Sequence, residues 1–133
     1  MKENKIFKIA IDIHGVIDAL PEIFAFLSKA VIEAGGEVHI LTGKHWTSKI
    51  DNDLKKFGIS WTNYFSISDY HKKLGTPISY IKEDHPYIDT DLWNATKAIY
   101  CKEKGIDLCI DDSSEYHKYF ETPYCLFYLK DIE

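Results

Sequence analysis

The chain has 133 residues, of which 45% are hydrophobic and 14% aromatic, so it can bury one sizeable core and is not a disordered chain. Its formal net charge of −5 excludes a dedicated binder of duplex nucleic acid, which would present a basic face. A small phosphorylated substrate remains compatible with this charge, because local charge can oppose net charge. We expect a single domain over residues 1–133.

The chain shows no sign of secretion or membrane insertion. The residues MKENK are followed by an apolar run too short for a secretory signal, and no stretch approaches the length of a membrane span. We therefore expect a cytoplasmic location and no membrane partner. The cysteines are odd in number, lack C-x-x-C spacing and have apolar neighbours, which predicts reduced, buried, structural thiols at Cys101, Cys109 and Cys125.

The first quarter of the chain predicts a buried strand followed by a helix. Residues 5–12 (KIFKIAID) end in an apolar run, as a central parallel strand does. The helix is expected to begin at an Asp18 cap, with Pro21 in its first turn, and to stop at Gly35-Gly36. Its core face is expected to hold Ile23, Leu27, Ala30 and Ala34, with Phe24 and Val31 beside them.

The next segments repeat this alternation. Residues 37–43 (EVHILTG) predict a second buried strand. Thr47 or Ser48 can cap the helix that follows, and Gly58 ends it. The inner face of this helix is expected to hold Ile50, Leu54 and Phe57. Residues 59–67 are rich in aromatic and β-branched side chains and predict a third strand.

The middle of the chain is less regular. Residues 68–88 are rich in turn-forming residues and contain two prolines, so we expect a small irregular insertion there that begins with a short helix, SDYHKKL. Thr90 then opens a helix that ends at Gly105. The apolar face of this helix is expected to hold Leu92, Ala95 and Ile99.

The last part of the chain predicts two more strands. Residues 106–112 (IDLCIDD) form the fourth and residues 124–129 the fifth. Between them, Asp112-x-x-Glu115 has the pattern of a capping box. The helix it would begin carries Tyr116, Tyr119 and Phe120.

Strands that alternate with helices predict an open doubly wound α/β domain, with a mostly parallel five-stranded sheet and helices on both faces. Sites in such sheets form at the carboxyl ends of the strands. Asp12, Asp111 and Asp112 would converge there, near Thr42 and Lys44. Taken singly, each has an ordinary explanation as a cap or a turn residue. Placed together, three carboxylates favour a Mg²⁺ site, because the cation removes their mutual repulsion.

The order of these motifs resembles the haloacid dehalogenase-like (HAD) superfamily, in a form with a minimal cap. IAIDIHGVID is similar to the first motif of that family, HILTGK to the second and LCIDD to the fourth. The resemblance covers nearly the whole chain except residues 68–88. It implies a Rossmann-like core and a Mg²⁺-dependent phosphohydrolase that acts through an aspartyl-phosphate.

The resemblance also implies roles for particular residues. Asp12 would attack phosphorus, and Thr42 would donate a hydrogen bond to the phosphoryl oxygens, helped by backbone N–H groups near Gly43. Lys97, 15 residues before Asp112, would hold the nucleophile and the phosphate together, with Lys82 as the alternative. The metal ligands would be Asp12, Asp112, the backbone carbonyl of His14 and, through water, Asp111.

His14 departs from the family pattern, which has a second aspartate as general acid and base at this position. Histidine could take that role, because its pKa lies near neutrality. The alternative is a catalytically weak domain that binds a phosphorylated ligand or a protein partner. A non-enzymatic receiver of the flavodoxin type ranks last, because its acidic pair comes early in the chain, whereas Asp111 and Asp112 come late.

Little sequence is left to cover the site, so we expect it to be open. An open site suits a macromolecular substrate, or a homo-oligomer in which a neighbouring subunit closes the cleft. Lys44 could bind a second phosphate and Trp46 could stack on a base, which favours a nucleotide or a polynucleotide end. Packing of Trp46 on the protein surface explains that residue equally well.

Overall fold

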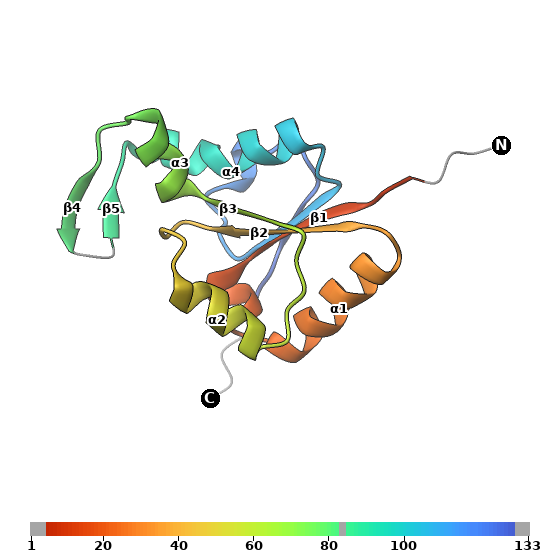
Figure 1. The fold of residues 1–133 in the computed structure, drawn as a ribbon. Coiled ribbons are helices and arrows are strands. Elements are labelled where there is room, and N and C mark those ends of the chain that lie inside the picture. The colour runs from red at the N-terminus through yellow and green to blue at the C-terminus, as the bar shows by residue number, and fades with distance from the viewer. Residues whose placement is uncertain (1–4, 83–84, 130–133) are drawn as a thin grey trace.

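A five-stranded, all-parallel sheet forms the centre of the molecule, as predicted (Figure 1). The computed structural model describes residues 5–82 and 85–129, with the backbone alone for residues 80–82 and 85–87. The strand order is β3-β2-β1-β6-β7. These strands are β1 (Lys8–Asp12), β2 (Glu37–Thr42), β3 (Asn63–Ser66), β6 (Leu108–Asp111) and β7 (Tyr124–Leu126). Each is shorter than its predicted range.

Helices cover both faces of the sheet (Figure 1). On one face, α1 (Pro21–Glu33) and α2 (Ser48–Lys56) pack on a cluster that includes Ile11 and Ile40. On the other face, α4 (Thr90–Lys104) packs on a cluster that includes Ala10, Leu41 and Cys109. Among the residues that the structure describes, no helix is both long and apolar enough to cross a membrane.

The helix boundaries follow local chemistry, with one correction. The Thr47 side chain caps α2 by accepting a hydrogen bond from the Ile50 N–H, 3.3 Å away. Asp18 does not cap α1, because its carboxylate instead accepts a hydrogen bond from the Gly15 N–H at 2.8 Å. Leu20 holds the N-cap position of α1, and Pro21 lies in the first turn.

The core-facing sides of α1 and α4 differ from those predicted. In α1, Phe24 and Ser28 are buried while Ile23 is 57% exposed, and Ala30 and Ala34 are also exposed. The Ser28 hydroxyl accepts a hydrogen bond from the Ser60 N–H, which lets this polar residue replace an apolar one in the interface. In α4, Leu92 and Ile99 are exposed. The buried residues of α4 are Asn94, Thr96, Lys97, Ala98, Tyr100 and Cys101.

The predicted irregular insertion is more ordered than expected. It contains α3 (Ile67–Leu74) and an antiparallel hairpin of β4 (Ser79–Lys82) and β5 (His85–Tyr87), which projects beyond the sheet (Figure 1). The two strands pair with each other, as in Ser79 opposite Tyr87, and not with the main sheet.

Two further predictions near the C-terminus are wrong. Asp112 and Glu115 form no capping box, and the only helical turn between them and residue 129, where the described part of the chain ends, is a 3₁₀ helix, His117–Tyr119. The carboxylate of Asp112 lies beside Gly15 and therefore cannot cap a helix. Cys125 is exposed, because it lies on the edge strand β7, whereas Cys101 and Cys109 are buried as expected.

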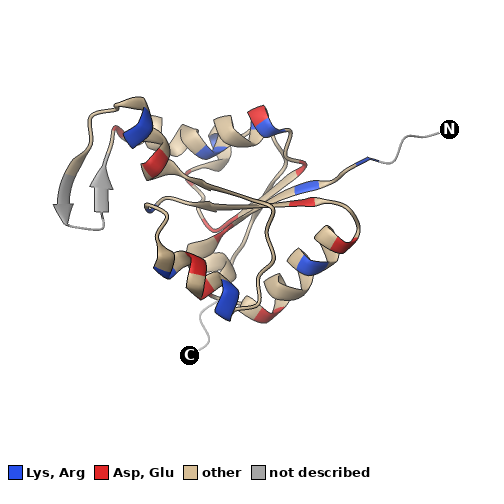
Figure 2. Cartoon of the chain, in the orientation of Figure 1, with Lys and Arg blue, Asp and Glu red and all other residues tan. Residues whose placement is uncertain are grey.

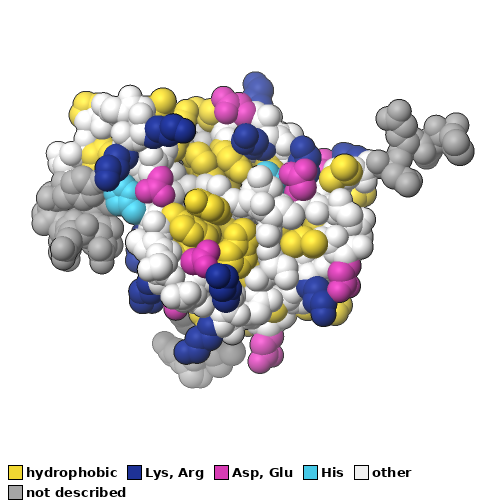
Figure 3. All heavy atoms as spheres, in the orientation of Figure 1, with side chains coloured by type: hydrophobic (Ala, Val, Ile, Leu, Met, Phe, Trp, Pro, Cys, Tyr) yellow, Lys and Arg dark blue, Asp and Glu magenta, His cyan; other side chains and the backbone are white. Residues whose placement is uncertain are grey.

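Lysines and acidic residues occur together on α1 and α2 (Figure 2), and they pair one turn apart, as in Lys29–Glu33 and Lys55–Asp51. Hydrophobic side chains gather at the β3 edge near α3 (Figure 3), where Tyr64 and Leu74 line a groove.

Candidate active site

Three carboxylates meet at the carboxyl edge of the sheet. Asp12 ends β1 and Asp111 ends β6, and these strands are neighbours in parallel register, with Ile11 opposite Ile110. Asp112 follows directly. One carboxylate oxygen from each aspartate lies within 4.8 Å of the others. Strands β2 and β3 lie on one side of β1, and the later strands β6 and β7 lie on the other. Open α/β sheets bind ligands in the crevice at such a switch point.

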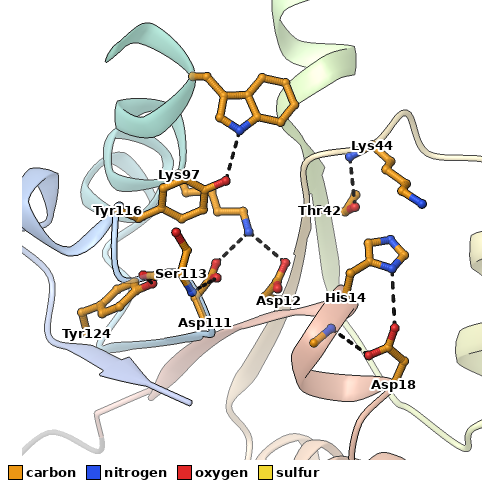
Figure 4. Close-up of polar contacts among 12 residues, drawn as sticks. Asp12, His14, Asp18, Thr42, Lys44, Lys97, Asp111, Ser113, Tyr116 and Tyr124 are labelled. Carbon is orange, nitrogen blue, oxygen red and sulfur yellow. Dashed lines mark hydrogen bonds and ion pairs between the residues drawn. The ribbon is translucent and has the colours of Figure 1, made fainter. Parts of the chain in front are cut away.

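Lys97 reaches this cluster from α4. Its ammonium donates hydrogen bonds to Asp12 Oδ1 at 2.9 Å and to Asp111 Oδ2 at 2.7 Å (Figure 4). Lys97 is only 2% exposed. Burial alone would lower its pKa, but the two carboxylates outweigh burial and raise the pKa above its usual value. Lys97 is therefore a fixed positive charge within the site.

One ammonium does not balance three carboxylates. Burial raises the pKa of Asp12 to about 7, with Lys97 opposing that shift and Asp111 adding to it. Burial and the neighbouring Asp111 also raise the pKa of Asp112. The cluster therefore has an excess of negative charge, which a further cation would relieve.

The turn after β1 fits closely against this cluster. Gly15 has φ +88°, and a Cβ at this position would lie 2.0 Å from Asp112 Oδ2. Glycine is needed here both for its backbone conformation and for the space that it leaves for the carboxylate.

His14 lines the site from the same turn. Its Nδ1 lies 3.6 Å from Asp18 Oδ2 (Figure 4). Burial lowers the pKa of His14, and Lys44 lowers it further, against the opposing effect of Asp18. The ring is therefore neutral at pH 7 and can accept a proton.

These residues surround a cavity of about 360 Å³ at the edge of the sheet. It holds most of the residues predicted for the site: Asp12, His14, Gly43, Lys44, Lys97, Asp111 and Asp112. The side chain of Lys82, the alternative to Lys97, lies outside the described residues. The structure brings Lys97 to the two aspartates, as the family resemblance implies.

Thr42 and Trp46 do not line this cavity. Thr42 is fully buried at the end of β2, and its hydroxyl accepts a hydrogen bond from the Lys44 N–H at 3.2 Å. The ring of Trp46 stacks on Tyr64, with ring centroids 4.2 Å apart, and also lies near Trp61. Trp46 therefore packs against the β3 side of the protein, as the second of its two interpretations expects.

Three residues of the cavity wall were not predicted: Trp93, Ser113 and Tyr116. The Trp93 indole N–H donates a hydrogen bond to Tyr116 Oη at 3.1 Å, and the Tyr116 ring lies 5.3 Å from the Lys97 ammonium. Trp93 lies four residues before Lys97, so helical spacing alone places both on one side of α4. The helix that was expected to carry Tyr116 does not form there, and Tyr116 lies in a turn instead.

Comparisons with protein-family models, with curated proteins and with solved structures found no match for this chain. What the site does must be inferred from its own geometry and chemistry.

Proposed function

We propose that the chain is a Mg²⁺-dependent phosphomonoesterase that uses Asp12 as its nucleophile. The observation that carries this proposal is the convergence of Asp12, Asp111 and Asp112 around the Lys97 ammonium at the carboxyl edge of a parallel sheet. The order of the motifs, which resembles that of HAD phosphatases, supports the same reaction. A cytoplasmic location remains a prediction from the sequence.

The donor atoms fit Mg²⁺. All three side chains offer carboxylate oxygens, which this ion prefers. Both oxygens of Asp111 already accept hydrogen bonds, from Lys97 and from the Ser113 N–H at 3.1 Å. As the family resemblance implies, Asp12, Asp112 and the backbone carbonyl of His14 would hold the ion directly, and Asp111 would act through water. When bound, Mg²⁺ would neutralise charge on the phosphoryl group.

The protein would supply the remaining chemistry. Lys97 holds Oδ1 of Asp12, so Oδ2 is left to attack phosphorus. The new Asp12–phosphorus bond replaces the bond to the leaving oxygen, and water then releases phosphate from the aspartyl-phosphate. The neutral His14 ring can accept the proton of that water.

Release of phosphate from p-nitrophenyl phosphate tests the proposal. With Mg²⁺ present, Asp12→Asn should lower the rate at least about a thousandfold, because the nucleophile is lost. Asp51→Asn, which changes an aspartate paired with Lys55 on the surface of α2, should leave the rate unchanged. EDTA should abolish the activity and added Mg²⁺ restore it. Full activity in Asp12→Asn, or in EDTA, would refute the proposal.

His14 favours a second candidate, a domain that binds a phosphorylated ligand or protein with little turnover. Its lowered pKa makes it a poor proton donor to a leaving group. On this alternative, phosphate and Mg²⁺ would raise the melting temperature while no phosphate ester is hydrolysed.

The structure also changes which residues could contact a nucleotide substrate. Trp46 packs away from the cavity, so a nucleotide base would have to contact Trp93 and Tyr116 instead. A nucleotide or a polynucleotide end remains a proposal on that basis. A homo-oligomer that closes the open site remains one as well.

A further inference from the structure

A second cavity of about 420 Å³ adjoins the first. Both cavities are lined by His14 and Lys44, so the two spaces meet at these residues. The rest of the second wall comes from the loop after β2 and from α2: His45, Thr47, Ser48, Lys49, Ile50 and Asp53.

The charges around the second cavity favour an anion. Its lining holds two lysines but only one carboxylate, Asp53, which pairs with Lys49 at 2.7 Å, so the charge of Lys44 is not balanced within this lining. Lys44 forms no ion pair with any carboxylate in the described part of the chain. Lys44 is exposed, so a ligand can reach its ammonium. Figure 4 shows its side chain next to His14, on the side of the site away from Tyr116.

The loop that carries Lys44 is held in place from α3. The Ser66 hydroxyl donates a hydrogen bond to the Lys44 carbonyl at 2.6 Å. One oxygen of Asp69 accepts a hydrogen bond from the Trp46 N–H at 3.0 Å, and the other lies 2.7 Å from Nδ1 of His45. The loop is therefore positioned before a ligand arrives, which lowers the entropic cost of binding.

We propose that the second cavity binds a second phosphate group, carried by the leaving group of the substrate, with Lys44 at the boundary between the two phosphates. The substrate is then a bisphosphorylated small molecule rather than a simple monoester. This inference rests on the proposed phosphomonoesterase function, because the first phosphate occupies the cavity beside Asp12. The inference specifies that the leaving group carries a phosphate, a property that the three aspartates do not reveal.

A binding measurement tests this inference without turnover. Calorimetric titration of the Asp12→Asn chain should show adenosine 3′,5′-bisphosphate binding at least about tenfold more tightly than adenosine 5′-monophosphate, because one charge-assisted contact is added. Glucose 1,6-bisphosphate against glucose 6-phosphate repeats the comparison with a sugar. Tighter binding of the bisphosphate in both pairs would show that the site recognises the second phosphate itself. Tighter binding in only one pair would show that the site recognises that class of bisphosphate. If Asp12→Asn does not fold, the wild-type chain in EDTA replaces it.

A pair of lysine variants locates the effect. Lys44→Ala should remove the preference for the bisphosphate, bringing the ratio of dissociation constants close to one. Lys56→Ala, an exposed lysine at the far end of α2, should keep the ratio of the wild type. Equal affinity for monophosphate and bisphosphate in the wild-type background would overturn the inference, as would a preference that survives Lys44→Ala.

Turnover separates this inference from the function on which it rests. The ratio of kcat/KM for bisphosphate and monophosphate should match the ratio of affinities. If p-nitrophenyl phosphate is hydrolysed but neither pair shows a preference, the phosphatase stands and the second site is refuted. If nothing is hydrolysed but the bisphosphates bind more tightly through Lys44, the second site stands and the phosphatase is refuted.

Discussion

Replacing Lys97 with methionine tests the electrostatic account of the site. Methionine keeps most of the side-chain length but removes the charge that pairs with Asp12 and Asp111. Both carboxylates are buried, and Asp111 is only 1% exposed. Removing one partner of such a buried pair costs about 3–5 kcal/mol, since a charge is left without compensation.

The same variant should change how stability depends on pH. Burial already raises the pKa of Asp12 to about 7. Without Lys97, this pKa lies still further above the unfolded value near 3.9, so the folded state binds more protons than the unfolded state. Stability of the variant should therefore fall as pH rises from about 4 toward 8. The gap between variant and wild type is expected to be wider at pH 7.5 than at pH 5, where the Asp12 carboxyl is protonated in both proteins.

Urea and thermal unfolding, followed by circular dichroism in EDTA, would measure both effects. With an unfolding entropy of about 2.1 cal/mol/K per residue, a loss of that size lowers the melting temperature by roughly 10–18 °C. Lys102→Met is the matched control, because Lys102 lies on the same helix but pairs with Glu121 on the surface. It should change stability little. A loss under about 1 kcal/mol for Lys97→Met at pH 7.5, or a gap that does not vary with pH, would refute this reasoning.

Three further predictions concern the scaffold. Gly15→Ala should lower the free energy of unfolding in urea by about 1–3 kcal/mol more than Gly35→Ala does. Both glycines have φ +88°, but only at Gly15 would a Cβ meet Asp112. Equal losses in the two variants would contradict the close contact. Thr47→Ala should destabilise by about 1 kcal/mol through loss of the α2 cap, measured in the same way. Burial lowers the pKa of His39, so the unfolded chain takes up a proton there as pH falls below about 6.5 and wild-type stability drops. His39→Gln should lose less stability than wild type between pH 7 and 5, and identical losses would show that His39 does not contribute.

Much of the fold could be predicted because central parallel strands have a recognisable local sequence pattern. The strand that ends at Asp12 and the one that ends at Asp111 are short apolar runs buried on both faces, a pattern that few other elements produce. Alternation with helices then restricts the topology to a doubly wound sheet. Because parallel strands end at one edge, the sequence also predicted that the acidic residues after them would lie together.

The helix faces could not be predicted in the same way. Apolar periodicity assigned Leu92 and Ile99 of α4 to the core, yet both are exposed, while Thr96 and Lys97 are buried. The Thr96 hydroxyl lies 2.8 Å from His71 Nε2, and the Lys97 ammonium bonds to Asp12, 85 positions away in the chain. A buried polar side chain needs a hydrogen-bonding partner, and for Lys97 that partner comes from a distant part of the chain.

The sequence by itself determined the strands, their order of alternation and the carboxylates at their ends, since these depend on local patterns of apolar burial. Only the tertiary structure decided which tryptophan faces the cavity, which lysine joins the aspartates, and that Lys44 lies between two cavities. The physical reason is that apolar burial repeats with the period of the local backbone, whereas the place of a charge depends on partners brought near by the whole fold.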